Sequence, residues 1–217
     1  MNKYALIVFD LDGTLLDTAG EVTDAINDTF NEVGLAAITL EQTRNWVGKG
    51  APNFLEKALE FCDVKLQTQQ EFDQLLTIFY RHYEKRSGTN SQIFPHVAEV
   101  LNELHQSGSK VALLTNKFMV GTQLVLKAHQ LHHLFDDILA GDSFPQKKPD
   151  PVGLHFLMNK YNLSAEQILY IGDSSTDVQT ARNAGVDVWV VPYGYNHGDD
   201  IREAKPDRII QNLSCLS

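Results

Sequence analysis

The sequence predicts an α/β fold in which a doubly wound, mostly parallel sheet carries an inserted, all-helical cap domain. Short continuous apolar runs, of the kind that form strands buried on both faces, occur near the N-terminus and again in the second half of the chain. Strand-like and helix-like segments alternate from residue 95 to about residue 192, which is typical of a doubly wound sheet. Residues 17–90 break this alternation, because they read as helix throughout.

The strands are expected where apolar runs end in polar or turn-forming residues. The run YALIVF, residues 4–9, is followed at once by carboxylates and a glycine. The runs KVALLT and ILYI likewise end in polar residues or glycine. The full set of expected strands is 4–9, 110–115, 137–140, 168–171, 187–191 and 208–210.

The helices are expected where apolar residues recur at three- and four-residue spacing. For example, Val97, Leu101 and Leu104 share one helical face. The expected helices of the α/β part are 96–106, 120–129, 151–161 and 176–183. Those of the helical stretch are 17–33, 40–47, 52–61 and 69–86.

The helical stretch follows directly after the first strand and its loop, so we interpret it as an insertion into the sheet domain. The segment SGTNS, residues 87–91, has the composition of a return linker. The predicted division is therefore a catalytic core made of residues 1–16 and 91–217, and a helical cap made of residues 17–90.

Composition narrows the class of protein. The chain has 217 residues, of which 43% are hydrophobic and 21% charged, so a packed core is expected. Its formal net charge of -10 offers no general attraction for nucleic acid or for an anionic membrane. The two cysteines make neither a disulfide framework nor a zinc spacing, and no apolar run is long enough to span a bilayer. We expect a soluble, cytoplasmic protein that acts on a small molecule.

Polar residues gather at the carboxyl ends of the expected strands, which is where ligands bind in open α/β sheets. Two carboxylates follow the first strand, KVALLT ends in a hydroxyl and is followed by an amide, and two carboxylates follow ILYI. A lysine in QKKPDP adds a positive charge. The candidate site residues on this rim are Asp10, Asp12, Thr115, Asn116, Lys148, Asp173 and Asp177.

The residue types on this rim indicate metal-assisted phosphoryl transfer. Clustered carboxylates repel one another unless a cation is present, and oxygen ligands without Cys or His favour a hard cation such as Mg²⁺. A carboxylate can attack phosphorus, and a second carboxylate two residues away can transfer a proton. A hydroxyl and a lysine can hold the phosphoryl oxygens.

The motifs DLDGTLLD at Asp10–Asp17, Thr115-Asn116, Lys148 and GDSSTD at Gly172–Asp177 resemble, in order and spacing, the four motifs of the haloacid dehalogenase superfamily. The resemblance covers essentially the whole chain. It implies a Rossmann-like core, and the aspartate at position 12 together with GDSSTD favours the magnesium-dependent phosphatase branch over the metal-free, halide-releasing branch.

The resemblance also implies roles for the rim residues. Asp10 is the expected nucleophile, and Asp12 the general acid and base, which also offers its backbone carbonyl to the metal. Thr115 is expected to bind the phosphoryl group. Lys148 is expected to steady both nucleophile and phosphate. Asp173 is an expected Mg²⁺ ligand, and Asp177 is either a further ligand or the partner of one.

The helical insertion resembles the small cap of this superfamily, which closes over the site and selects the substrate. Within it, RNWVGKGA at Arg44–Ala51 looks like the specificity loop of bacterial phosphoglycolate phosphatases, although Lys49 stands where relatives more often carry a small polar residue. Gly48 and Lys49 are therefore expected to bind substrate together with Thr115, Asn116 and Lys148. Arg44 and Lys49 are the candidate readers of a substrate carboxylate.

The sequence thus predicts a magnesium-dependent phosphatase that hydrolyses a small phosphate monoester through an aspartyl-phosphate on Asp10. The favoured substrate is 2-phosphoglycolate, and the protein is expected to be a monomer or homodimer without nucleic-acid or membrane partners. The alternatives are a phosphomutase resembling β-phosphoglucomutase or a broad-specificity phosphatase, which share the same core. A regulatory protein that kept the fold without catalysis is a third, more distant alternative.

Overall fold

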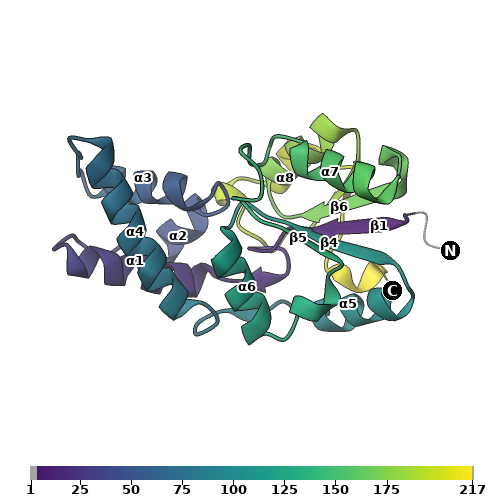
Figure 1. The fold of residues 1–217 in the computed structure, drawn as a ribbon, viewed down its shortest axis with the longest axis horizontal. Helices are drawn as coiled ribbons and strands as arrows, with labels where there is room; N and C mark the ends of the chain where they lie inside the picture. The colour runs from purple at the N-terminus through teal and green to yellow at the C-terminus, as the bar shows by residue number, and fades with distance from the viewer. Residues whose placement is uncertain (1–3, 217) are drawn as a thin grey trace.

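The computed structural model describes residues 4–216 of the chain. Its sheet and the helices that cover the sheet occupy one end of the molecule, and four further helices extend from the other end (Figure 1). The described part of the chain begins and ends at the sheet end, remote from the four helices (Figure 1).

The central sheet has six strands, and every neighbouring pair in it is parallel. The strands are β1 (Leu6–Phe9), β4 (Lys110–Leu114), β5 (Asp137–Leu139), β6 (Ile168–Gly172), β7 (Asp187–Val190) and β8 (Arg208–Ile209). Their spatial order is β5-β4-β1-β6-β7-β8. The six predicted strands and the doubly wound α/β class are confirmed.

Helices cover both faces of this sheet, as the continuous apolar strands require. They are α5 (Val97–Gln106), α6 (Met119–Ala128), α7 (Val152–Tyr161) and α8 (Ser175–Ala184). Ile7 and Phe9 of β1 pack in one cluster with α5 and α6, whereas Leu6 and Val8 pack in a second cluster with α7 and α8. Figure 1 shows these two helix pairs on opposite sides of the strands.

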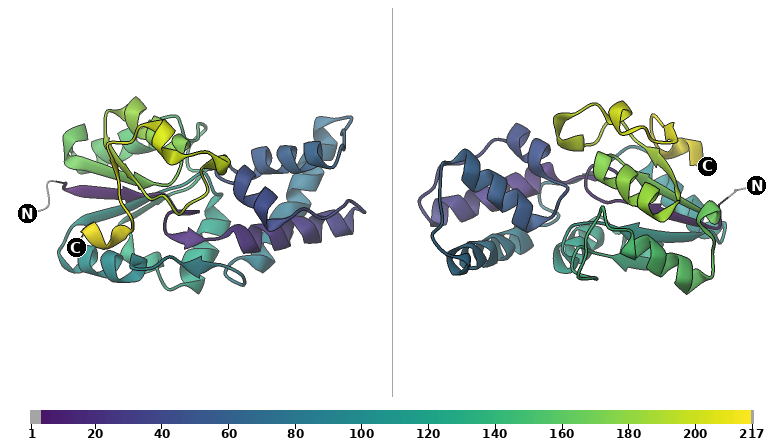
Figure 2. Two further views of the ribbon diagram at one scale, coloured as in Figure 1. Left: turned by 180° about the vertical axis from the view of Figure 1, so that it is seen from behind. Right: turned by 90° about the horizontal axis from the view of Figure 1, so that it is seen from above.

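The remaining four helices form a third apolar cluster of their own. They are α1 (Ala19–Glu32), α2 (Leu40–Trp46), α3 (Ala51–Phe61) and α4 (Gln69–Arg86). Thr39 and Thr68 begin α2 and α4 with reciprocal side-chain caps to Gln42 and Glu71. We call these helices and their connecting loops the helical cap; they lie apart from the sheet in each view (Figure 2).

A two-stranded antiparallel sheet, which we did not predict, joins the cap to the core. It pairs β2 (Leu16–Asp17) with β3 (Gln92–Ile93), directly before α1 and after α4. Two residues per strand are too few to show an alternating pattern in the sequence. This small sheet lies where the division between residues 16 and 17 and between 90 and 91 was placed, and that division stays a prediction.

Two other properties of the described residues bear on the expected class. Among residues 4–216, no helix combines the length and apolar character that a bilayer crossing requires. Cys62 and Cys215 are both free thiols, as the absence of a disulfide pattern predicted.

Candidate active site

The carboxyl ends of three neighbouring strands bring the predicted polar residues together. Asp10 follows β1, Thr115 follows β4 and Asp173 follows β6. The strand ladder continues into the site, because the backbone N–H of Asp10 donates to the carbonyl of Ile171 at 2.9 Å. The predicted rim residues all have exposures of 8% or less: Asp10, Asp12, Thr115, Asn116, Lys148, Asp173 and Asp177.

Lys148 lies between two of these carboxylates. Its Nζ is 2.8 Å from Asp10 Oδ1 and 2.7 Å from Asp177 Oδ1. Burial alone would lower the pKa of the Lys148 ammonium, but the charges of Asp10 and Asp177 raise that pKa above its usual value. Lys148 is therefore a fixed positive charge that touches the predicted nucleophile.

Tyr170 completes this arrangement, although the sequence predicted it only as an apolar strand residue. Its fully buried hydroxyl accepts a hydrogen bond from Lys148 Nζ at 2.9 Å. The same hydroxyl lies 2.9 Å from Asp177 Oδ1 and 3.1 Å from the carbonyl of Leu114. Burial, followed by the charge of Asp177, raises the pKa of Tyr170 well above its usual range, so the hydroxyl keeps its proton.

Asp10, Asp173 and Asp177 form a carboxylate cluster in which one oxygen from each residue lies within 4.8 Å of the others. Burial, with a further contribution from Asp177, raises the pKa of Asp10 to about 7 although Lys148 opposes the rise. Burial and the charges of Asp177 and Asp10 raise the pKa of Asp173 well above its usual range. Hard oxygen donors that repel one another when ionised fit a bound divalent cation.

Close backbone packing around Asp173 explains why Gly13 and Gly194 have no side chain. A Cβ atom on Gly13, which has a φ of +87°, would lie 2.2 Å from Asp173 Oδ2. A Cβ atom on Gly194 would also lie 2.2 Å from that oxygen. The carboxylate is held there by hydrogen bonds from the Thr14 hydroxyl to Oδ1 and from the Tyr195 backbone N–H to Oδ2.

Asp177 is held by more protein groups than the other two carboxylates. Its Oδ2 accepts from the backbone N–H groups of Asp173 and Ser174 and from the Ser174 hydroxyl at 2.7 Å. Burial alone would raise the pKa of Asp177, but Lys148, followed by hydrogen bonds from Ser174 and Tyr170, holds it below its usual value. Asp177 also caps the start of α8 reciprocally with Ser174, so it organises the rim in addition to belonging to the carboxylate cluster.

Asp12 lies outside this carboxylate cluster and has its own cation. Its Oδ1 accepts from the Thr18 hydroxyl at 2.6 Å and from Lys117 Nζ at 2.8 Å. Lys117 is only 7% exposed. We did not predict a role for Lys117; its position directly after Thr115-Asn116 at a strand end was the available signal.

Asn116 connects the cap to the core. Its amide Nδ2 donates to the Gly48 carbonyl of the cap and to the Lys148 carbonyl, both at 3.1 Å. Its Oδ1 accepts from the Lys148 backbone N–H at 2.9 Å. The predicted position at the pocket is thus observed, but the polar atoms of this side chain are bound to protein groups.

The structure does not bring the two predicted carboxylate readers into the pocket. Gly48 lines it, but Lys49 is exposed and lies outside the lining. The pKa of His197 is lowered by its burial and then by the charge of Lys49, which places Lys49 near the loop that contains His197. Arg44 is also exposed and pairs with Asp17 at 2.9 Å. The backbone of the loop faces the pocket, while its cations face elsewhere.

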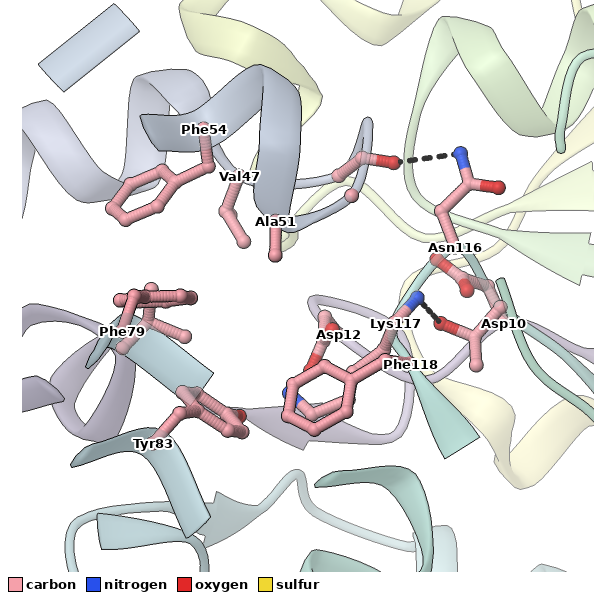
Figure 3. A pocket seen from close by; sticks show the side chains of 14 residues that line it. Asp10, Asp12, Val47, Ala51, Phe54, Phe79, Tyr83, Asn116, Lys117 and Phe118 are labelled. Atoms are coloured by element: carbon pink, nitrogen blue, oxygen red, sulfur yellow. Dashed lines mark hydrogen bonds and ion pairs between the residues drawn. The ribbon is translucent and has the colours of Figure 1, made fainter. Parts of the chain in front are cut away.

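A pocket between core and cap opens onto Asp10 and Asp12. Figure 3 shows Val47, Ala51 and Phe54 of the cap across this pocket from Asp12, Lys117 and Phe118. The complete lining consists of Asp10, Asp12, Val22, Val47, Gly48, Gly50, Ala51, Phe54, Phe79, Tyr83, Thr115, Asn116, Lys117 and Phe118.

The chain is similar to known proteins along its whole length. Residues 7–191 match the family model described as haloacid dehalogenase-like hydrolase. A phosphoglycolate phosphatase of Vibrio cholerae is 39% identical over 218 residues, covering 100% of this chain and 96% of the relative. One of Aliivibrio fischeri is 38% identical, with coverages of 97% and 94%. The crystal structure of a predicted phosphoglycolate phosphatase from Haemophilus somnus superposes with a TM-score of 0.92 at 33% identity, covering 98% of this chain and 96% of that one.

Proposed function

This chain belongs to the haloacid dehalogenase-like hydrolases, and we propose that it is a magnesium-dependent phosphatase that converts 2-phosphoglycolate to glycolate and phosphate. Its class as a phosphoric monoester hydrolase follows from its full-length relatives. The observation that carries the finer proposal is the convergence of Asp10, Lys148 and the carboxylate cluster beside one pocket.

Asp10 is the proposed nucleophile because, among residues 4–216, it alone belongs to the carboxylate cluster, contacts Lys148 and lines the pocket. One of its oxygens attacks phosphorus while the bond between phosphorus and the leaving oxygen breaks, which produces an aspartyl-phosphate. Water then attacks this phosphorus, and the carboxylate of Asp10 is released together with inorganic phosphate.

Asp12 is the proposed general acid and base. It lines the pocket beside Asp10, and hydrogen bonds from Thr18 and Lys117 fix its orientation. Asp12 gives its proton to the leaving oxygen in the first step and takes a proton from the attacking water in the second. Asp12 therefore returns to its initial protonation state after one turnover.

Thr115 and Lys148 are proposed to stabilise the transferring phosphoryl group. The Thr115 hydroxyl oxygen accepts from the Lys117 backbone N–H at 3.2 Å, which leaves its proton available to a phosphoryl oxygen. Lys148 holds Asp10 in place and supplies positive charge where negative charge develops. Asn116 supports Lys148 by accepting a hydrogen bond from its backbone N–H.

Asp10 and Asp173 would hold a magnesium ion, with Asp177 as a further ligand or as the group that orients the other two, and with the Asp12 backbone carbonyl as an added donor. The fit rests on the mutual distances of the carboxylate oxygens and on their hard, anionic character. When bound, the ion offsets the negative charge of the phosphate and of the clustered carboxylates.

Asp10→Asn tests the proposal. With 2-phosphoglycolate and Mg²⁺, we expect kcat to fall by on the order of 10³-fold or more, because an amide cannot form the acyl-phosphate. Asp63→Asn, the same change at an exposed position, serves as the matched control and should keep the parental rate. Phosphate release at an unchanged rate from the Asp10→Asn protein would reject Asp10 as nucleophile. Conversion of a sugar phosphate into its isomer, in place of free phosphate, would favour the mutase alternative.

A further inference from the structure

On the premise of the proposed function, we propose that Lys117 binds the carboxylate of the substrate, and that the apolar cap wall opposite it selects short leaving groups without hydroxyls. Lys117 is a buried cation in the lining of the pocket. It comes from the core and not from the cap loop where a carboxylate reader was expected. The substrate class is therefore a small, carboxylate-bearing phosphate monoester.

The first support is a comparison of the donors of two buried lysines. A lysine ammonium has three N–H donors. Lys148 Nζ donates to Asp177 and Tyr170 and also lies 2.8 Å from Asp10 Oδ1 as an ion pair. Among the described residues, the Lys117 ammonium has one hydrogen-bond acceptor, Asp12 Oδ1, and otherwise lies over the ring of Tyr83 at 4.7 Å from its centroid. Lys117 thus has donors left for a substrate anion.

The second support is the short distance between the Lys117 ammonium and the leaving oxygen. A general acid must approach the leaving oxygen within hydrogen-bonding distance, and Lys117 Nζ is 2.8 Å from Asp12 Oδ1. When Asp12 Oδ1 makes both contacts, the ammonium lies at most roughly 5–6 Å from the leaving oxygen, and proton transfer from Asp12 Oδ2 adds about 2 Å to that limit. In phosphoglycolate one CH₂ group separates the leaving oxygen from the carboxylate, so the carboxylate spans that gap. The exposed amine of Lys49 lies outside the pocket lining.

The third support is how firmly Lys117 is held. The Tyr83 ring beneath its ammonium packs against Phe118 with ring centroids 5.4 Å apart. The Tyr83 hydroxyl donates to Oε1 of the fully buried Glu21 at 2.7 Å. Tyr83 belongs to the cap and Lys117 to the core, so the two parts of the molecule position this ammonium jointly. A fixed cation in a site with little water binds an anion more strongly than a solvated one does.

The cap wall explains the second half of the proposal. Val47, Ala51 and Phe54 face the pocket from the cap and offer no side-chain hydrogen-bonding group (Figure 3). A hydroxyl on the leaving group would lose its water there without gaining a partner. Such a pocket rejects an added hydroxyl by up to roughly 100-fold. Polyol phosphates are therefore disfavoured substrates.

The test compares Lys117→Met with the matched variant Lys49→Met on two esters. Ethyl phosphate replaces the carboxylate of 2-phosphoglycolate by a methyl group and keeps the same ester. In Lys117→Met, we expect kcat/KM for phosphoglycolate to fall at least about 30-fold more than that for ethyl phosphate, because a charge pair in a desolvated site is lost. Lys49→Met should leave this preference within about twofold, as expected for an exposed charge.

Each outcome decides whether Lys117, Lys49 or neither binds the substrate carboxylate. Equal losses on both esters would mean that Lys117 acts only through Asp12 and would overturn the proposal. If Lys49→Met lost the preference for phosphoglycolate over ethyl phosphate, the group that binds the substrate carboxylate would be Lys49 of the cap loop. If Lys117→Met does not fold, Lys117→Arg keeps the charge and should keep the preference, and its loss there would also count against the proposal. Wild-type protein that releases phosphate from ethyl phosphate but not from phosphoglycolate would instead reject the proposed function.

A separate experiment tests the cap wall and needs only the wild-type protein. We expect 2-phosphoglycerate, which adds one hydroxyl to 2-phospholactate while both keep the carboxylate for Lys117, to have a kcat/KM at least about fivefold lower than that of 2-phospholactate. An equal or higher value would show that the wall accommodates hydroxyls, and this half of the proposal would fail.

Discussion

The core rim and the helical cap contribute to the same pocket in different ways. The rim residues Asp10, Thr115 and Asp173 each follow a strand, so the sheet fixes their positions. The cap contributes helix faces, and its placement depends on a few polar contacts with the core, such as that between Asn116 and the Gly48 carbonyl. In the proposed function, local sequence at strand ends sets the chemistry, whereas contacts between segments far apart in the chain set the selection of substrate.

The largest expected effect concerns the rim, and it appears when Mg²⁺ is removed at different pH values. The pKa of Asp10 is raised to about 7 from an ordinary value of 3.8, and that of Asp173 is raised well above 3.8. The folded protein therefore retains protons that the unfolded chain has lost. In EDTA, the free energy of unfolding should fall as pH rises from about 4 to 7, by up to about 1.4 kcal/mol per pH unit for each retained proton.

Urea unfolding at several pH values, with EDTA and with Mg²⁺ at matched ionic strength, measures this effect. The difference between the two curves should widen as pH rises, because the cation binds the ionised carboxylates. The lowered pKa of His197 works in the opposite direction near its ordinary value of 6.5, but it enters both curves and cancels in their difference. Curves that stay parallel over this range would show that the carboxylate cluster does not bind the metal ion.

The contrast between rim and cap also explains what the sequence could predict. Each rim residue lies at the end of an apolar run, and parallel strands bring such ends to one edge, so their meeting follows from the pattern. The side chains of Lys49 and Arg44 could not be placed in this way. Lys49 lies in a loop and Arg44 in the last turn of α2, and neither position determines whether the side chain turns toward the core; both cations are exposed.

Tyr170 and Lys117 were missed for different reasons. Tyr170 sits inside an apolar strand, where its ring satisfies the pattern and its hydroxyl leaves no signal. Lys117 follows two predicted site residues, but only the packing of Tyr83 from the cap shows that its side chain turns into the pocket. The two-residue strands β2 and β3 were too short to recognise from their sequence. What escaped prediction was therefore whatever depends on contacts distant in sequence.

The next effect tests the base of the cap, where Glu21 holds the Tyr83 ring that contacts Lys117 of the core. Glu21 is fully buried in α1, and its two oxygens accept from the Tyr83 hydroxyl at 2.7 Å and from the Gly88 backbone N–H at 2.6 Å. In Glu21→Gln, the single amide oxygen can serve only one of these donors. We expect the free energy of unfolding to fall by about 1–3 kcal/mol, the usual penalty for a buried donor without a partner.

Glu32→Gln is the matched control, since Glu32 is an exposed carboxylate of the same helix. It should change the free energy of unfolding much less, because exposed ion pairs contribute little. Chemical denaturation of both variants gives the comparison. If Glu21→Gln left stability unchanged but lowered kcat, the base of the cap would belong to the catalytic machinery, and the separation between rim and cap would not hold there.

The smallest effect sharpens the comparison within the rim itself. Tyr170→Phe removes the hydroxyl that accepts from Lys148 Nζ and keeps the ring in the core. Lys148 then has one donor without an acceptor, and it is held against Asp10 less precisely. We expect kcat for phosphoglycolate to fall about tenfold with little change in KM, because a hydrogen bond to a charged group is lost. Tyr161→Phe, which removes a hydroxyl bound to Asp137, should leave kcat unchanged.

A double-mutant cycle separates positioning from simple loss of stability. If Tyr170 acts through Lys148, then adding Tyr170→Phe to a Lys148→Ala protein should change kcat by less than about twofold, because the partner is already absent. An equal tenfold loss in both backgrounds would mean that the hydroxyl acts through Asp177 or Leu114 and not through the lysine. A lowered melting temperature with an unchanged kcat would leave Tyr170 with a purely structural role. In that case the rim, like the cap, would contain polar groups that hold the fold without taking part in the chemistry.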